Sequence, residues 1–157
     1  MRTKSFNKRN FSTNKSVPSS HHILEKVEAG IVLTGAEVKA VKTKRVDLTG
    51  SYVKIIGSET YLVNAKIYPY EYARNEGYEE TRTRKLLLHK TEIIALKSRL
   101  SQGNLTLVPL SLYERNGFIK LELALARGKK KYEKKRDLKE KDLEREAAYE
   151  LKSMRKV

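Results

Sequence analysis

Three histidines are the side chains of this 157-residue sequence best suited to metal binding or acid–base chemistry. His21 and His22 are adjacent in a segment predicted to be a strand, so they point to opposite faces and cannot hold one metal ion together. His89 lies in the run RTRKLLLHK without a recognisable partner. The chain has no cysteine and no Gly-rich phosphate loop, HExxH or GxSxG motif. We therefore expect no catalytic residue, metal or cofactor.

A mixture of tyrosines and basic side chains points to nucleic-acid binding instead. Three tyrosines lie within Tyr68–Tyr72, and Arg82, Arg84 and Lys85 follow. Aromatic rings stack on bases with roughly 1–3 kcal/mol each, and guanidinium groups bind phosphates. The alternative, that the tyrosines cover the core with their hydroxyls in water, stays open.

The charge is unevenly distributed along the chain. The 34 Lys and Arg against 19 Asp and Glu give a net charge of +15, which favours a polyanionic partner, with nucleic acid ahead of an anionic membrane surface. Residues 1–15 carry five basic groups and no acid, whereas 16–126 have a net charge of only +4. No stretch approaches the ~18 apolar residues of a membrane span. We expect a soluble cytoplasmic protein with a flexible basic arm (1–15), a folded body (16–127) and a basic tail (128–157).

Strand patterns dominate the body. Apolar residues alternate along Phe118–Ala126, and Asn116-Gly117 before it is a strong hairpin signal. The preceding strand, Leu105–Tyr113, contains Pro109, which predicts an edge or a bulge there. The runs Tyr52–Ile56 and Tyr61–Ile67 suggest another hairpin around Gly57–Thr60. His21–Leu33 reads as a further strand, with a bulge expected at Gly30.

Two segments have helical spacing. In Thr34–Lys44, Thr34 and Glu37 form a predicted capping box. In Lys85–Leu100 an apolar stripe is followed by Gly103 as a stop signal. Short strands with about two helices predict a mainly β fold, a small, closed or nearly closed barrel.

The last 30 residues differ from the body. They are rich in helix formers and carry only a thin apolar line through Leu143, Ala147, Leu151 and Met154. This line buries too little to offset an ordering entropy of about 1–2 kcal/mol per residue. We predict a tail that is disordered when free and becomes helical on a partner.

Several stretches together resemble the SmpB (small protein B, SsrA-binding protein) family. They include EAGI from Glu28, GAEVK from Gly35, RTRKLLL from Arg82 and ARGKK from Ala126. The resemblance implies an oligonucleotide-binding-type (OB-like) closed barrel of about six strands with two or three packed helices. It also implies a non-enzymatic protein that binds the tRNA-like domain of transfer-messenger RNA and delivers it to stalled ribosomes for trans-translation. The tail would then enter the empty messenger channel near the decoding centre.

Site residues follow from the matching motifs. The resemblance implies RNA contacts by Glu28, Leu87, His89 and Lys120, and charge adds Arg84 and Lys85. The ribosome-facing tail positions are Lys129, Lys130, Tyr132, Lys134, Arg136, Lys139 and Arg145. The chain departs from the family pattern at 17–21, at Lys44, where a glycine is usual, and at Leu143, where a tryptophan is common.

Two other function classes remain to be distinguished. A ribosomal or ribosome-assembly protein with a similar barrel would bind ribosomal RNA without requiring a tRNA-like fold. An RNase using His89 as its base would cleave RNA that it binds.

Overall fold

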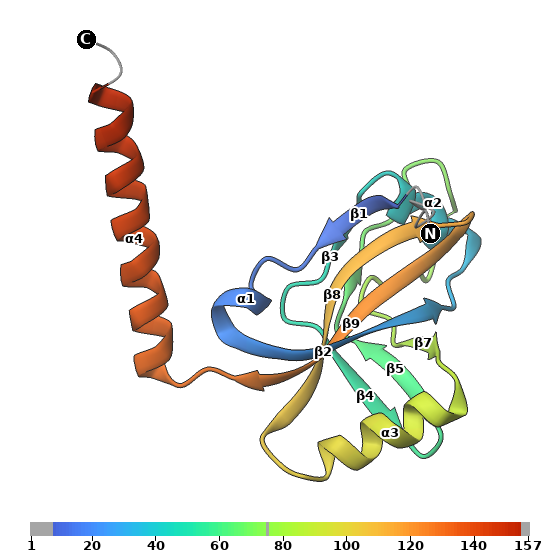
Figure 1. Ribbon diagram of the computed structural model, residues 1–157. Coiled ribbons are helices and arrows are strands. Elements are labelled where there is room, and N and C mark those ends of the chain that lie inside the picture. The colour runs from blue at the N-terminus through green and yellow to red at the C-terminus, as the bar shows by residue number, and fades with distance from the viewer. Residues whose placement is uncertain (1–7, 75, 155–157) are drawn as a thin grey trace, which may run out of the picture.

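The computed structural model describes residues 8–74 and 76–154. Nine strands and four helices are found in these residues, in an order that Figure 1 shows. The elements are β1 (Arg9–Thr13), α1 (Val17–Ser20), β2 (His21–Ile31), α2 (Gly35–Lys42), β3 (Val46–Asp47), β4 (Tyr52–Ile56), β5 (Glu59–Val63), β6 (Lys66–Ile67), β7 (Arg84–Leu87), α3 (Lys90–Leu100), β8 (Leu105–Arg115), β9 (Phe118–Gly128) and α4 (Lys131–Met154).

The larger sheet closes on itself. Its strand order is β1-β8-β4-β5-β7-β2-β9, and β9 also pairs with β8, so six strands form a ring. Strand β1 pairs with Ser111–Glu114 of β8 and adds Phe11 to the core. All of these pairings are antiparallel. The ring encloses a core of Leu, Val and Ile side chains contributed by every one of its strands. The predicted mainly β fold of about six strands with packed helices is confirmed.

The β8–β9 hairpin is the longest pairing and follows the sequence pattern closely. Asn116 (φ 53°) and Gly117 (φ 80°) both have the left-handed backbone that a type I′ turn requires. Arg115 pairs with Phe118, and Tyr113 pairs with Lys120. The register shifts between Pro109 and Ser111, which confirms the irregularity expected at the proline.

The bulge expected at Gly30 is wrong. Gly30 pairs regularly with Leu87 of β7 and Lys120 of β9, and the bulge in β2 lies between Ile23 and Glu25. Gly30 instead allows a close approach of the two strands: a Cβ at this position would lie 3.1 Å from the Cβ of Leu87, so a larger residue would require Leu87 to shift slightly.

The helix predicted over Lys85–Leu100 begins too early. Residues Arg84–Leu87 form strand β7, and helix α3 begins only at Lys90. The run RKLLLHK has apolar residues that fit either period. Pairing of β7 with both β5 and β2 decides for the strand, because without β7 the ring would be open.

Helix α2 starts with the predicted capping box. The Thr34 hydroxyl accepts a hydrogen bond from the Glu37 backbone N–H at 3.3 Å, and a Glu37 carboxylate oxygen accepts one from the Thr34 N–H at 3.0 Å. Lys44, just after the helix, has φ 63°. This left-handed conformation explains why glycine suits the position and lysine is strained there.

The two ends of the described chain pack differently from each other. Residues Arg9–Thr13, expected in the flexible arm, form β1 against β8 with Phe11 buried, so the boundary at residue 16 is wrong. Residues 1–7 of the expected arm lie outside the described residues. At the other end α4 projects away from the barrel (Figure 1). Whether this helix forms only on a partner stays a prediction.

Candidate nucleic-acid interface

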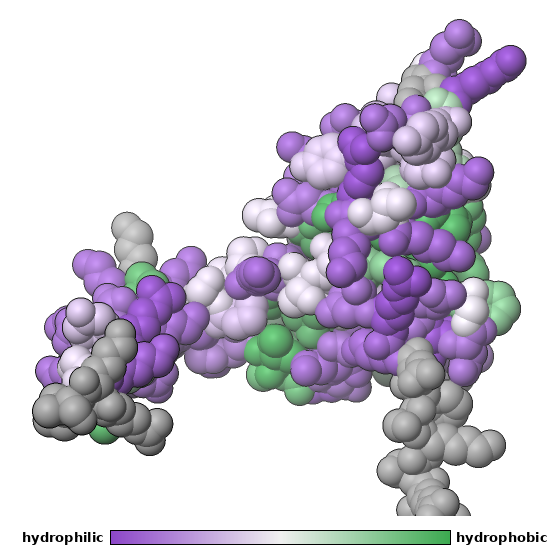
Figure 2. Space-filling view, turned by 90° about the horizontal axis from the view of Figure 1, so that it is seen from above, coloured by the Kyte–Doolittle hydropathy of each residue, from purple (hydrophilic) through white to green (hydrophobic). Residues whose placement is uncertain are grey.

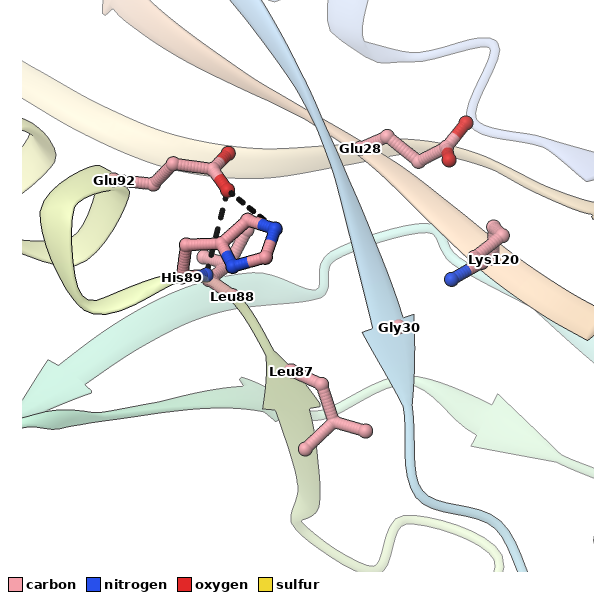
Figure 3. A pocket seen from close by; sticks show the side chains of 7 residues that line it. All are labelled: Glu28, Gly30, Leu87, Leu88, His89, Glu92 and Lys120. Atoms are coloured by element: carbon pink, nitrogen blue, oxygen red, sulfur yellow. Dashed lines mark hydrogen bonds and ion pairs between the residues drawn. The ribbon is translucent and has the colours of Figure 1, made fainter.

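Four of the six predicted RNA-contacting residues meet in one pocket of about 390 Å³. Glu28, Leu87, His89 and Lys120 line it, together with Gly30, Leu88 and Glu92. Strand β2 runs between β7 and β9 in the sheet, so Leu87 approaches from one side of it and Lys120 from the other (Figure 3). Residues separated by up to 92 positions in sequence are thus brought together by strand order alone.

Strand alternation decides which residues of β7 reach the pocket. Leu87 is 54% exposed, whereas Leu86 beside it is buried in the core. Successive side chains of a strand point to opposite faces, so Lys85 and Leu87 face outward and Arg84 and Leu86 face inward. Gly30, opposite Leu87, leaves the leucine side chain room to lie across β2.

His89 lies at the rim, immediately before helix α3. Its backbone N–H donates to a carboxylate oxygen of Glu92 at 3.3 Å, and its ring Nε2 lies 4.0 Å from the same oxygen (Figure 3). The side chain is 89% exposed. An imidazole so exposed is available to a ligand as a hydrogen-bonding and stacking group.

Glu28 and Lys120 give the pocket opposite charges. Burial alone would raise the pKa of Glu28, but hydrogen bonds from Tyr113 and Arg115 and the charges of Arg115 and Lys120 lower it below its usual value. The carboxylate is therefore ionised at neutral pH and acts only as a hydrogen-bond acceptor. Lys120 can bind a phosphate, and its ammonium also lies 5.8 Å from the ring centroid of Phe118.

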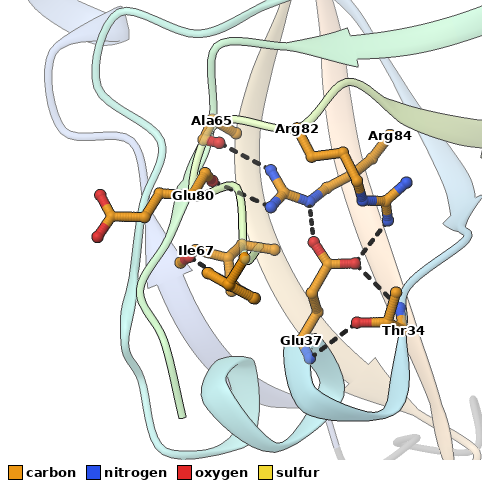
Figure 4. A network of polar contacts seen from close by, with 8 residues as sticks. Thr34, Glu37, Ala65, Ile67, Glu80, Arg82 and Arg84 are labelled. Atoms are coloured by element: carbon orange, nitrogen blue, oxygen red, sulfur yellow. Dashed lines mark hydrogen bonds and ion pairs between the residues drawn. The ribbon is translucent and has the colours of Figure 1, made fainter. Parts of the chain in front are cut away.

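Arg84 cannot contact RNA, contrary to expectation. Its side chain is fully buried, with Nε donating to Glu37 at 2.5 Å and the two terminal nitrogens donating to the carbonyls of Ala65 at 2.8 Å and Glu80 at 3.0 Å (Figure 4). Arg82 binds the other oxygen of Glu37 at 2.5 Å. Arg84 lies on the inward face of β7, and its guanidinium joins α2, the segment between β5 and β6, and the loop before β7.

Lys85 is exposed on the outer face of β7 but points away from the pocket. Its ammonium lies 3.2 Å from a carboxylate oxygen of Glu59 in β5. It is not among the lining residues of the pocket. A contact with RNA by Lys85 stays a prediction.

The predicted tail positions are mostly displayed to solvent. Tyr132, Arg136 and Lys139 follow a spacing of four and three residues, which places them on one side of helix α4. Lys130 and Tyr132 also line a hollow of about 540 Å³ with Arg127. Lys134 and Arg145 are exposed elsewhere on the helix. Figure 2 shows hydrophilic side chains over much of the body face in view and over the part of the helix it displays.

Lys129 differs from the other tail positions because its side chain is only 10% exposed. The ammonium donates to the Pro18 carbonyl at 2.9 Å and to the carboxylate of Asp137. Near it, Nε2 of His22 lies 2.6 Å from a carboxylate oxygen of Glu133. These contacts fasten the first two turns of α4 to α1 and β2. A ribosomal contact by Lys129 therefore stays a prediction.

Tyr113 and Arg115 are the residues near the pocket that the sequence interpretation missed. Both contact the carboxylate of Glu28 from β8. A signal for Tyr113 was available, because a two-residue turn at Asn116-Gly117 places it opposite Lys120. The contact itself also required β2 to lie on the far side of β9.

No helix in the described part of the chain is both long and apolar enough to cross a membrane.

Comparison with known proteins agrees with this geometry. A family model described as SmpB protein matches residues 11–153. The SsrA-binding protein of Sulfurihydrogenibium sp. (strain YO3AOP1) is 50% identical over 135 residues, covering 86% of this chain and 89% of the relative. The SsrA-binding protein of Persephonella marina is 42% identical over 146 residues, covering 93% and 96%.

A solved structure described as "tmRNA-SmpB: a journey to the center of the bacterial ribosome" superimposes with a TM-score of 0.65. It is 44% identical in sequence, with 76% of this chain and 85% of the other covered. The family match spans the barrel, the pocket and nearly all of helix α4. This chain is a member of the SmpB family.

Proposed function

We propose that this protein binds the tRNA-like domain of transfer-messenger RNA (SsrA) and delivers it to stalled ribosomes for trans-translation. The observation that carries the proposal is the pocket in which Glu28, Leu87, His89 and Lys120 meet, in a chain whose relatives are SsrA-binding proteins. The protein acts in the cytoplasm, where ribosomes are, and catalyses no reaction itself.

The lining of the pocket suits an unpaired nucleotide. An ionised carboxylate accepts hydrogen bonds from base amino or imino groups, an exposed leucine packs on a base face, and a lysine binds phosphate. A folded RNA with splayed-out bases offers all three partners at once. A regular duplex hides its base faces, so the pocket favours a tRNA-like fold over arbitrary double helices.

The tail is proposed to serve a different surface. Residues 131–157 carry ten basic and seven acidic groups, and the contacts of Glu133 and Asp137 described above lie in the first two turns of helix α4. Its exposed stripe of Tyr132, Arg136 and Lys139 combines an aromatic ring with cations, the composition that binds single-stranded nucleic acid. We assign this stripe to the ribosome.

A gel-shift comparison tests the function. The protein is expected to prefer the tRNA-like domain to a ribosomal RNA fragment of equal length. With four to six phosphates neutralised, the log–log salt dependence should have a slope of roughly −3 to −5. Equal affinity for both RNAs would instead support a ribosomal or assembly protein. RNA that is degraded by catalytic amounts of protein would support a nuclease.

Replacing Glu28 with glutamine tests the pocket. Although the change removes a negative charge facing a polyanion, we expect affinity for the tRNA-like domain to fall about tenfold, because a charge-assisted hydrogen bond to a base is lost. Glu25→Gln, in the same strand, is the matched control, because its carboxylate pairs with Arg99 away from the pocket. Unchanged or tighter binding by Glu28→Gln would remove this pocket from the interface.

A further inference from the structure

Glu28 faces another carboxylate directly across the sheet. In the β2–β9 pairing it lies opposite Glu122, and like charges in that position are destabilising. Each carboxylate has its own cations. Glu122 lies 3.6 Å from the Lys8 ammonium and 4.0 Å from that of Lys26, whereas Glu28 lies 3.1 Å from Arg115. The arrangement maintains a negative charge at Glu28 where the sheet alone would disfavour it.

Tyr113 supplies the second contact to Glu28. It belongs to β8, and its hydroxyl reaches over β9 to donate a hydrogen bond to Oε2 of the carboxylate. The residue is 2% exposed, and the Lys8 ammonium lies 4.2 Å from its ring centroid. Burial and the bond to Glu28 raise the pKa of Tyr113, so its proton stays on the phenol oxygen. The hydroxyl is thus a permanent donor.

Tyr113 and Arg115 both contact the Glu28 carboxylate at Oε2. The carboxylate is therefore held from the β8 side, while the Glu28 side chain lines the pocket. An anchored carboxylate loses less conformational entropy when it binds a base than a freely rotating one.

We propose that Tyr113, assisted by Arg115, is a positioning residue that holds the Glu28 carboxylate in place for base recognition. The inference rests on the proposed function and adds a specificity device to it. An ionised carboxylate accepts hydrogen bonds only, so the pocket selects base edges that present donors and rejects edges that present acceptors. Tyr113 itself does not touch the RNA.

The substitution Tyr113→Phe removes the hydroxyl and keeps the ring in the core. We expect affinity for the tRNA-like domain to fall about three- to tenfold, the size of one net hydrogen bond. In a Glu28→Gln background the same substitution should have no further effect, because the group that it positions is gone. Tyr78→Phe, which removes a hydroxyl bonded to the Ile67 carbonyl at 2.7 Å, is the matched control and should bind normally.

The pH dependence of binding provides a readout that packing alone would not change. Loss of the Tyr113 bond lets burial raise the pKa of Glu28, so the decrease in affinity on acidification should begin at higher pH in the variant than in the parent. The other groups around Glu28 are common to both proteins and cancel in the comparison; they are Lys8, Arg115, Lys120, Glu122, His89 and Glu92. Arg115→Gln removes the second contact from the exposed side and should shift the profile in the same direction without altering the core.

The outcomes separate the inference from the proposed function. If Glu28→Gln weakens binding but Tyr113→Phe does not, or if their effects simply add, the positioning role is overturned and the function stands. If Glu28→Gln leaves affinity unchanged, the pocket is not the RNA site and the positioning role is overturned, whereas the function is decided by the gel-shift comparison of the two RNAs. Two results together support the positioning role and the function: Tyr113→Phe weakens RNA binding only when Glu28 is present, and its loss of affinity on acidification begins at higher pH than in the parent.

Discussion

Replacing Glu37 with glutamine is expected to destabilise the fold by about 3–5 kcal/mol, the usual cost of removing one partner of a buried ion pair. The Glu37 and Arg84 side chains are 2% and 0% exposed, with Nε and carboxylate oxygen 2.5 Å apart. Glutamine preserves the shape and can still cap α2, but it leaves a buried guanidinium without a counter-charge. For a chain of this size, thermal unfolding should show a Tm lower by roughly 6–20 °C.

The pH dependence of stability follows from the same pair. Burial raises the pKa of Glu37, but hydrogen bonds from Arg82, Thr34 and Arg84 outweigh it, and the net effect lowers the pKa in the folded protein. A lowered folded-state pKa contributes stability above the unfolded value, about 4.3 for glutamate. This contribution is lost as the pH falls through the folded value. Glu37→Gln should therefore flatten the acid limb of the stability curve.

Arg82→Gln is the matched control for this network. Arg82 binds the same carboxylate but is 38% exposed, so water replaces the lost contact and the cost should stay within about 1 kcal/mol. Similar losses for Arg82→Gln and Glu37→Gln would contradict the role assigned to burial. The network also matters for the pocket, because Arg84 holds β7, the strand that presents Leu87.

The parts of the fold that sequence could predict are those set by local chemistry. Asn116-Gly117 allows a turn that few other dipeptides can make, so the hairpin and its register were readable. Thr34 and Glu37 likewise cap α2 through contacts three residues apart. In both cases neighbouring residues are sufficient to define the structure.

The errors arose where distant strands decide the structure. RKLLLHK satisfies a helical and an extended pattern equally, and only its pairing with β5 and β2 makes it a strand. The same ambiguity hid the burial of Arg84, because an arginine beside lysines is normally exposed. Tyr113 and Glu28 are 85 positions apart, so their contact depends on strand order that no local signal reports.

Deleting residues from Lys131 onward, which removes helix α4, should abolish peptide tagging of stalled chains. The same deletion should change affinity for the tRNA-like domain by no more than a few-fold. All residues that line the pocket precede the deletion. The deleted segment has a net charge of only +3, so its loss removes little non-specific attraction to RNA. Tagging needs a group that reaches the ribosome, and helix α4 is the element that projects from the body (Figure 1).

Two measurements on the same protein decide whether the barrel and tail divide the work in this way. RNA affinity is measured by gel shift, and tagging in reconstituted translation on a message without a stop codon. A truncation after Met154 keeps helix α4 and should retain both activities. If the longer deletion abolishes RNA affinity instead, the tail must help to bind transfer-messenger RNA, and the contacts of Glu133 and Asp137 with the body would support the RNA site. Loss of tagging with retained affinity requires that recognition and ribosome contact lie on separate elements.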